Sequence, residues 1–293
     1  MTTPRVSFCL PTWNGEHDLE RLLPAIERSR VPGGHEIVAI DSSSSDRTAD
    51  VLRDAGARLR IIEQSLFRHG ATRNALVREA RGDVLVFLSQ DASPRDDTTF
   101  TRLVAALDDE RTAGAFARLL PHDDDDALTA RTVMDAPESS PTPRVYDLAA
   151  GERPKDGDPR FHNVACAVRA SVLRALPFPD VEFGEDEAWA RAALESGWRV
   201  RYVPEAVVLH AHRYSPATAF ARYKTDAAFH ARVNARAVRP NLWSVVKGVA
   251  HEVRADWRFV RREKLPLATL LRSPALRAAQ VWGQYVGSRP ARG

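Results

Sequence analysis

The chain has 293 residues, of which 44% are hydrophobic and 28% charged, a composition that is ordinary for a globular protein with a substantial core. Cys9 and Cys166 are its two cysteines, which excludes a disulfide-stapled scaffold and favours a reducing, cytoplasmic environment. We see no signal peptide and no apolar run near the roughly 20 residues that span a bilayer, so we expect a soluble or membrane-peripheral protein.

The net charge of +3 conceals an asymmetry along the chain. Residues 213–293 carry 16 Lys and Arg against 4 Asp and Glu, whereas residues 1–212 carry 26 against 35. Such asymmetry indicates different partners for the two segments. A solvated helical surface explains the basic segment equally well.

The first ninety residues alternate short apolar strands with amphipathic helices. The predicted strands are residues 6–10, 36–40, 59–62 and 84–88, and the predicted helices are 19–26, 48–55 and 71–80. We expect Pro11 to stop the first strand and Asp46 to cap the second helix. This alternation predicts right-handed βαβ units and a mostly parallel sheet, in which ligands bind beyond the carboxyl ends of the strands.

Small and polar residues follow three of these strands. They are residues 11–14, 41–45 and 89–91. Asp41 can accept a hydrogen bond from a nucleobase N–H, although the serines after it are also typical of a flexible loop. Asp91 can hold Mg²⁺ or Mn²⁺, hard cations that prefer oxygen ligands, or it can cap the next helix.

The third predicted helix begins with the run His69-Gly70-Ala71-Thr72-Arg73-Asn74. Arg73 lies near the helix start, where a guanidinium and the helix dipole together attract phosphate. A surface arginine is the alternative explanation. We expect His69 to shape the loop.

The second half of the chain is less regular. Residues 121–157 are rich in Asp, Pro and Ser and predict a long mobile loop, with a solvated run at Asp123–Asp126. Residues 161–176 predict a strand and a helix, and Glu185–Ser196 a helix followed by two strands near residues 200–202 and 207–209. After Tyr214 the pattern is helical, with breaks at the prolines 240, 266 and 274.

Two groups in this half suit acid–base or metal chemistry. Glu185, Asp186 and Glu187 open a helix, and Asp186 is our candidate general base, although a helix dipole alone also favours acids there. His210 and His212 end a strand and should face opposite sides, so only one can join Asp91. We choose His210; a structural histidine is the alternative.

Seven motifs, taken in order, resemble the family-2 glycosyltransferases, which are inverting enzymes of the GT-A fold, and most of all their bacterial rhamnosyltransferase branch. The motifs span roughly residues 5–230 and are residues 10–15, 40–46, 69–74, 87–92, 183–186, 197–200 and 203–210. The resemblance implies an α/β fold with a Rossmann-like, mostly parallel central sheet flanked by helices. It implies a catalytic domain over residues 1–214, with a nucleotide-binding half near 1–92 and an acceptor half near 93–214. Residues 215–293 would form a basic amphipathic helical extension.

The resemblance also assigns site residues. The donor nucleotide would be bound by Pro11, Thr12, Asn14, Asp41, Ser42, His69, Arg73 and Gln90. Asp91 and His210 would hold Mg²⁺ or Mn²⁺ at the diphosphate, and Asp186 would be the catalytic base. Residues that contact the acceptor or support the site would be Trp13, Asn163, Glu185 and Trp189.

Two positions depart from the family pattern. Ser89 stands where the usual Asp-x-Asp metal motif has its first acid, which implies weaker metal affinity, and Ser42 stands where a second acid is frequent. The implied reaction moves a sugar from a nucleotide-diphosphate donor, with dTDP-rhamnose suggested by kinship, to a hydroxyl of a glycan or polyprenyl-linked acceptor. The configuration at the sugar inverts in a single displacement.

The C-terminal helices mix aromatic and cationic residues, which suits an anionic membrane surface. We therefore expect a cytoplasmic protein with peripheral contact at the inner face of the membrane, and no nucleic-acid partner. Two rival functions are kept. A sugar nucleotidyltransferase would typically have a glycine-rich basic loop after the first strand, and residues 11–16 are not one. A non-catalytic nucleotide-sugar-binding protein is favoured by the missing acid at Ser89.

Overall fold

The computed structural model describes residues 5–149, 152, 159–233 and 237–289. These residues form two compact units. The first unit comprises the chain up to Leu120 together with Pro137–His210, and the second comprises Pro121–Ala136 together with the chain from Ala211 onward.

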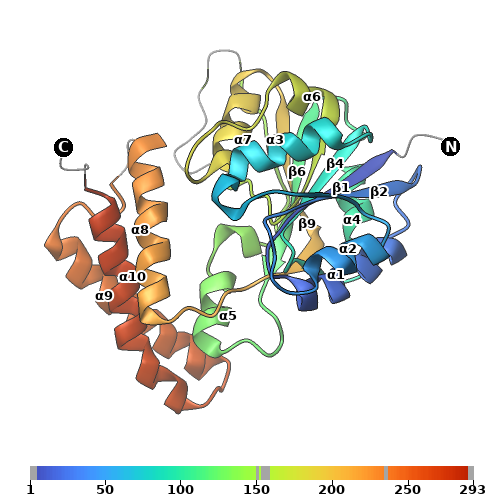
Figure 1. Ribbon diagram of the computed structural model, residues 1–293. Coiled ribbons are helices and arrows are strands. Elements are labelled where there is room, and N and C mark those ends of the chain that lie inside the picture. Colours follow the sequence, from blue (N-terminus) through green and yellow to red (C-terminus); the bar gives the residue numbers. More distant parts are fainter. Residues whose placement is uncertain (1–4, 150–151, 153–158, 234–236, 290–293) are drawn as a thin grey trace. The chain divides into compact units, whose positions relative to one another are not determined.

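A mixed sheet forms the centre of the first unit (Figure 1). Among the described residues it has nine strands, in the order β3-β2-β1-β4-β8-β6-β9-β5, with β7 paired to β9. Their bounds are β1 Val6–Thr12, β2 His35–Asp41, β3 Arg58–Ile61, β4 Val84–Leu88, β5 Ser93–Pro94, β6 Thr112–Leu120, β7 Arg144–Tyr146, β8 Ala165–Arg169 and β9 Arg199–Leu209. Strands β3, β2, β1 and β4 pair in parallel, as do β6 and β9, while β8 runs antiparallel between β4 and β6.

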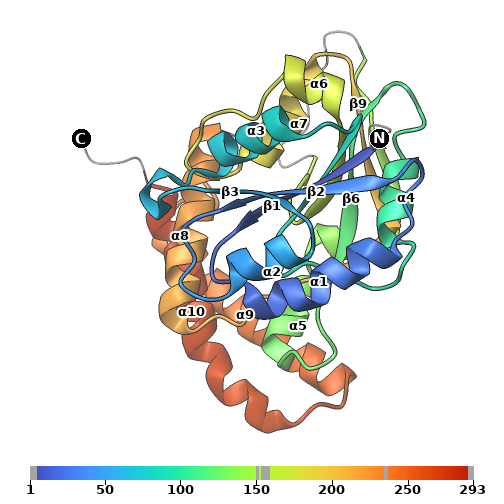
Figure 2. The ribbon, with the colours of Figure 1, turned by 45° about the vertical axis from the view of Figure 1, so that its right-hand side comes forward.

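Helices cover both faces of this sheet, as Figures 1 and 2 show. One face carries α1 Glu16–Arg28, α2 Thr48–Asp54 and α4 Thr99–Ala105; the other carries α3 His69–Glu79, α6 Ala170–Ala175 and α7 Glu185–Glu195. A separate apolar cluster lies under each set of helices, because alternate strand residues point to opposite faces. The predicted α/β sheet flanked by helices is confirmed.

The first strand does not stop at Pro11 as we predicted. Strand β1 continues to Thr12, and beyond Cys9 it is paired only with β2. Proline is tolerated in a strand where one side lacks a hydrogen-bonding neighbour, because its missing N–H then breaks no ladder. The extra residues carry the chain directly to the site.

The prediction of a loop over residues 121–157 is wrong for about half of its described part. Helix α5, Ala127–Met134, is followed by the 3₁₀ turn η2, Pro137–Ser139, and by β7. Asp126 caps α5, accepting hydrogen bonds from the backbone N–H groups of Leu128 and Thr129. Residues 150, 151 and 153–157 of the predicted loop lie outside the described residues.

The two strands predicted after α7 are the single strand β9. Its pairing with β6 shifts between Val203 and Val207, so residues 204–206 form an irregularity that contains Pro204. An extra stretch of this kind lets a proline sit inside a strand without losing the ladder on either side.

The second unit is helical, as we predicted for the part of it that follows Tyr214. It consists of α5, α8 Pro216–Val233, α9 Leu242–Arg262, the 3₁₀ helix η3 Leu267–Arg272 and α10 Ser273–Gly287. The prolines 240, 266 and 274 each lie at a helix start, where a missing N–H costs nothing. In the described chain we find no helix that combines the length and the apolarity needed to cross a membrane.

Buried charges join the helices of the second unit. Asp256 on α9 is 0% exposed and accepts hydrogen bonds at 2.8 Å from both Nε and Nη2 of Arg277 on α10. Arg131 on α5 lies against the same carboxylate and also pairs with Glu252. Burial alone would raise the pKa of Asp256, but the hydrogen bonds from Arg277 and Ser273 and the two arginine charges outweigh it, so this pKa is lowered.

Candidate active site

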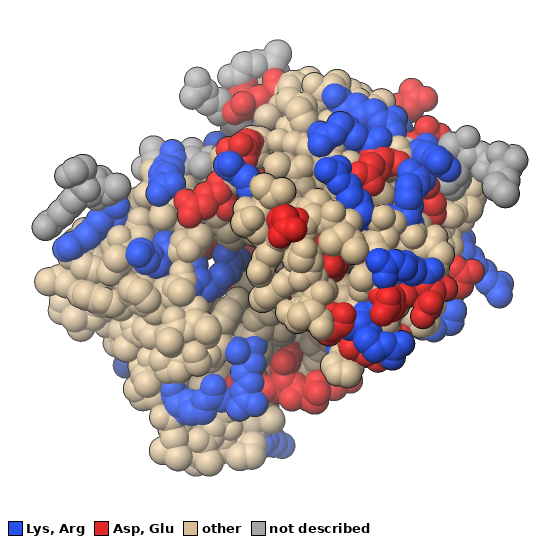
Figure 3. All heavy atoms as spheres, in the orientation of Figure 1, with Lys and Arg blue, Asp and Glu red and all other residues tan. Residues whose placement is uncertain are grey.

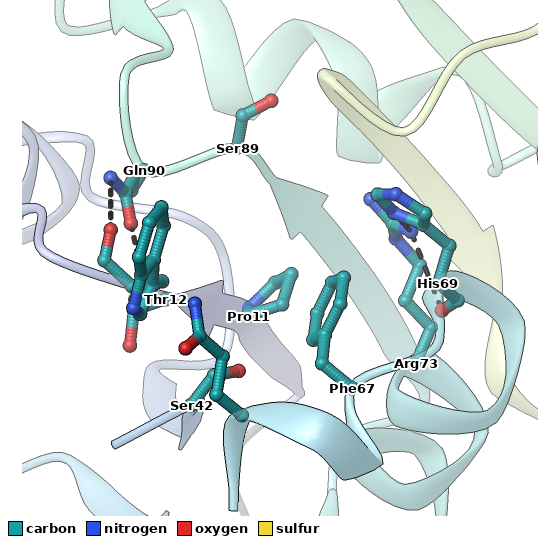
Figure 4. Close-up of a pocket in the computed structure, with 10 residues that line it drawn as sticks. Pro11, Thr12, Ser42, Phe67, His69, Arg73, Ser89 and Gln90 are labelled. Carbon is teal, nitrogen blue, oxygen red and sulfur yellow. Dashed lines mark hydrogen bonds between the residues drawn. The ribbon is translucent and has the colours of Figure 1, made fainter. Parts of the chain in front are cut away.

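A cavity of about 500 Å³ opens at the carboxyl ends of β1, β2 and β4 (Figure 4). Its walls combine aromatic and proline rings with a few polar side chains: Pro11, Thr12, Trp13, Ser42, Gln64, Phe67, His69, Arg73, Ser89 and Gln90. In parallel sheets the carboxyl ends of adjacent strands form a crevice of this kind. Six of the eight donor residues that the resemblance suggested line this cavity, and the other two, Asn14 and Asp41, make their hydrogen bonds behind it.

Asp41 is turned into the protein. It is 1% exposed, and its Oδ1 accepts hydrogen bonds from Thr12 Oγ1 (3.1 Å) and Ser44 Oγ (2.5 Å), while Oδ2 accepts from the Ser44 backbone N–H (2.9 Å). Its carboxylate therefore holds the loop together. Ser42, the next residue, does line the cavity, and its buried Oγ has no hydrogen-bond partner among the described residues.

Gln90 holds Trp13 through both ends of its side-chain amide. Oε1 accepts from the Trp13 backbone N–H (2.9 Å) and Nε2 donates to the Trp13 carbonyl (3.1 Å), as the dashed lines of Figure 4 show. Gly15 permits this approach, because a Cβ there would lie 2.4 Å from the Gln90 amide carbon. The amide that we expected to bind the donor thus shapes the cavity wall.

Asn14 joins the two loops at this edge. Its backbone N–H donates to Ser44 Oγ (2.8 Å), and its Oδ1 accepts from the Ser45 N–H (2.8 Å). Its φ of 47° lies in the left-handed region, which asparagine tolerates better than most residues. Like Asp41, it orders the loops around the cavity.

Asp91 and His210, far apart in the sequence, lie close together. Asp91 Oδ2 and His210 Nδ1 are 3.3 Å apart, and the His210 backbone N–H donates to the Leu120 carbonyl of β6. Strand β9 ends at Leu209, so the alternation from which we placed His210 and His212 on opposite sides does not apply to them. A carboxylate oxygen beside an imidazole nitrogen is a donor pair that fits Mn²⁺ and related divalent ions.

Asp186 lies in the first turn of α7, just after Gly184, whose φ of 78° requires glycine. Its Oδ2 accepts from the Asn163 backbone N–H (3.0 Å) and its Oδ1 from the Glu187 N–H (2.9 Å). The carbonyl of Val164, next to Asn163, accepts from the N–H of Ser89 at the cavity (2.9 Å). This short segment therefore bridges the cavity and Asp186.

Glu185 is buried against Arg73. Arg73 Nη1 and Glu185 Oε1 are 2.6 Å apart, and Asn163 Nδ2 donates to the same oxygen (3.1 Å). Burial, and then the charge of Asp186, raise the pKa of Glu185, while the Arg73 charge opposes that rise.

His162 is a residue that we missed from the sequence. Its Nε2 lies 3.0 Å from the carbonyl of Ala117 on β6, and its buried Nδ1 has no partner in the described part of the chain. Burial lowers its pKa, with smaller effects from the charges of Glu138, Asp186 and His210. The sequence signal that could have pointed to His162 is its position next to Asn163, which we had assigned to the site.

Trp189 is 0% exposed, and its Nε1 donates to the Leu176 carbonyl (2.9 Å). Its ring packs against Phe161 and Phe178. We had assigned Trp189 either to acceptor contact or to support of the site. A fully buried ring fits support of α7 and does not fit contact with an acceptor.

The profile of the family described as Glycosyl transferase family 2 matches residues 7–176. The chain belongs to this family. The match covers the cavity and Asp91, while Asp186 and His210 lie beyond it.

Curated relatives place the chain near one branch of the family. It is 31% identical over 233 residues to the O-antigen chain rhamnosyltransferase RfbN of Salmonella typhimurium, covering 78% of this chain and 73% of that protein. It is also 31% identical over 201 residues to the O-antigen chain rhamnosyltransferase WbaN of Salmonella anatum, covering 67% and 62%.

Solved structures share the fold. The mannosyltransferase PcManGT of Pyrobaculum calidifontis, determined with GDP-Man and Mn²⁺, superposes with a TM-score of 0.61 at 20% identity, over 98% of this chain and 88% of that one. Glucosyl-3-phosphoglycerate synthase of Mycobacterium tuberculosis gives a TM-score of 0.54 at 21% identity, over 82% and 83%. The expected GT-A fold of this glycosyltransferase is thereby confirmed.

Proposed function

We propose that this family-2 enzyme is an inverting glycosyltransferase that moves a sugar, for which rhamnose is our first choice, from a nucleoside diphosphate to a hydroxyl of a glycan or lipid-linked acceptor. The observation that carries the proposal is the cavity at the strand ends, with the Asp91–His210 pair and the α7 start bearing Asp186 connected to it. The names of RfbN and WbaN support rhamnose, and dTDP-rhamnose is the donor that follows.

The donor nucleotide fits the cavity by its chemistry. A planar base suits the apolar walls made by Pro11, Trp13 and Phe67, and the Ser42 hydroxyl can both donate to and accept from a base edge. Arg73 brings positive charge to the wall near the diphosphate. The GDP-Man of PcManGT, a protein of the same fold, supports a nucleotide sugar as the ligand class.

Asp91 and His210 would hold the divalent ion, Mg²⁺ or Mn²⁺. When bound, such an ion neutralises the charge that develops on a departing diphosphate. Ser89 supplies no second carboxylate at this position.

Asp186 would act on the acceptor. As the acceptor oxygen forms its bond to the anomeric carbon, the bond from that carbon to the diphosphate oxygen breaks and its electron pair leaves with the nucleotide. The hydroxyl proton passes to Asp186, which must approach within about 2.6–3.2 Å of that oxygen in the productive complex. Attack from the face opposite the leaving group inverts the configuration.

A donor panel tests the proposal. Purified protein is screened with dTDP-, UDP- and GDP-sugars for thermal stabilisation, which grows with ligand excess over the dissociation constant, and each binder is assayed with Mn²⁺ for sugar release. We expect dTDP-rhamnose to bind and to be hydrolysed slowly without acceptor. Binding without any hydrolysis or transfer would favour the non-catalytic rival, and no binding by any sugar nucleotide would refute the proposal.

We also propose that α9 contacts an anionic membrane surface. Trp243 and Trp257 are 64% and 46% exposed, and cations lie over both rings, Lys247 at 5.1 Å and Arg261 at 4.7 Å. The two acids of this helix, Glu252 and Asp256, are paired inside the unit. The outward face of α9 therefore keeps basic and apolar groups, and Figure 3 shows basic side chains on broad uncharged areas of the second unit.

Vesicle flotation tests this contact. The wild type should bind vesicles containing phosphatidylglycerol and dissociate as salt is raised, and the double variant W243A/W257A should bind about 10-fold more weakly. Val145→Ala, at a 54% exposed apolar residue of the first unit, is the matched control. Equal binding by the double variant would exclude α9 as the contact.

A further inference from the structure

Helix α3 is fixed to the segment that precedes α7. A Cβ on Gly70 would lie 2.5 Å from the Pro179 carbonyl oxygen, so glycine allows this close approach. Asn74 makes two hydrogen bonds to the Phe178 backbone, donating through Nδ2 to its carbonyl (2.9 Å) and accepting at Oδ1 from its N–H (3.0 Å). Together with the Arg73–Glu185 pair, three residues of one motif contact residues 178–185.

Arg73 connects this docking to the donor cavity. It lines the cavity, as Figure 4 shows, while its Nη1 is committed to Glu185 at 2.6 Å. Its side chain is 10% exposed and that of Glu185 is 5% exposed, so the ion pair is largely shielded from water. Breaking one partner of such a pair leaves an uncompensated buried charge.

The connection continues to Asp186 through Asn163. Its side-chain amide donates to Glu185, and its backbone N–H donates to Asp186 Oδ2 at 3.0 Å. Glu185 and Asp186 are adjacent in the first turn of α7, so a shift of one moves the other. Misplacing a reacting group by about 1 Å can cost about 100-fold in rate.

We propose that Arg73 and Glu185 are positioning residues that fix Asp186 relative to the bound donor. This inference rests on the proposed function, in which Asp186 is the base. Glu185 makes the inference testable, because it is not among the residues that line the cavity. If Arg73 served only to bind phosphate, a change at Glu185 would leave turnover unaffected.

The test separates donor binding from turnover. In Glu185→Gln the amide oxygen can still accept from Arg73 and Asn163 but carries no charge. We expect its kcat to fall about 10-fold or more while the dissociation constant of the donor stays within about 3-fold of wild type. Arg73→Gln should lower kcat as much, and the double variant should lose no more than the worse single variant, because the two residues act as a unit.

Hydrogen exchange supplies a measurement that needs no activity. Amides of residues 178–190 should exchange faster in both single variants, without ligand, than in wild type. Arg78→Gln on α3 and Glu195→Gln on α7, both exposed, are the controls and should match wild type in rate and exchange. If Glu185→Gln fails to fold, Glu185→Asp, which keeps the charge but shortens the reach to Arg73, takes its place, with the same expected split between kcat and donor binding.

The outcomes are distinguishable. Unchanged kcat in Glu185→Gln, or additive losses in the double variant, would overturn the positioning role while leaving the proposed function intact. A wild type that neither binds nor transfers sugar would refute the proposed function, and the exchange measurement would still decide whether Arg73 fixes the α7 start.

Discussion

Gly70→Ala isolates the docking of α3 against the segment before α7. The added Cβ would lie 2.5 Å from the Pro179 carbonyl oxygen, and ordinary heavy-atom contact begins at about 3.5 Å, so the segment must move by about 1 Å. That segment leads into Asp186, and we expect kcat to fall by about 10- to 100-fold. Overpacking costs about 1–3 kcal/mol, and alanine in place of a helical glycine returns about 1 kcal/mol, so the free energy of unfolding should fall by about 0–2 kcal/mol.

The assay measures kcat, donor affinity and denaturant unfolding on the same preparation. Ala71→Ser, at the exposed neighbouring position, is the control and should match wild type in all three. A Gly70→Ala enzyme whose kcat stays within 2-fold of wild type would refute the reasoning, because it would show that the position of residue 179 does not govern Asp186.

Three further predictions follow from the structure. Asp256→Asn should lower the free energy of unfolding by about 3–5 kcal/mol, because it leaves the buried Arg277 charge uncompensated. Folding lowers the pKa of Asp256, so its contribution to the free energy of unfolding is fully present above the ordinary aspartate pKa and is lost as the pH falls through the lowered pKa. Urea titrations at decreasing pH should show this loss of stability in the wild type and not in the variant. Gln90→Ala should weaken nucleoside diphosphate binding by about 3- to 10-fold in calorimetry by freeing Trp13, and an unchanged affinity would show that the clamp is dispensable. Asp91→Asn should weaken Mn²⁺ binding by about 10-fold or more in electron paramagnetic resonance titrations, whereas equal binding would remove it from the metal site.

Periodicity predicted the layers of the fold well, because each short apolar run is bounded by a turn. It failed where tertiary pairing decides the outcome. Whether Pro11 ends a strand depends on which side of β1 lacks a neighbour, and this is settled by the length of β4. Helix α5 was missed because its burial comes from α9, more than a hundred residues later.

The sequence predicted which residues gather at this edge of the sheet better than it predicted the contacts that they make there. The ends of parallel strands must meet, so residues 11–14, 41–45 and 89–91 had to share an edge, and Asp91 did meet His210. Residue type alone does not say where a polar side chain points. It did not reveal that the Asp41 carboxylate bonds to Thr12 and Ser44, or that Gln90, which lines the cavity, bonds to the Trp13 backbone.

Asp186→Asn tests the central claim most directly, since asparagine keeps the shape of the side chain and cannot take up the proton. Donor affinity, measured by calorimetry in the presence of Mn²⁺, should stay within about 3-fold of wild type, while turnover to acceptor falls by about 100-fold or more. Turnover near the wild-type rate in that variant would contradict the account.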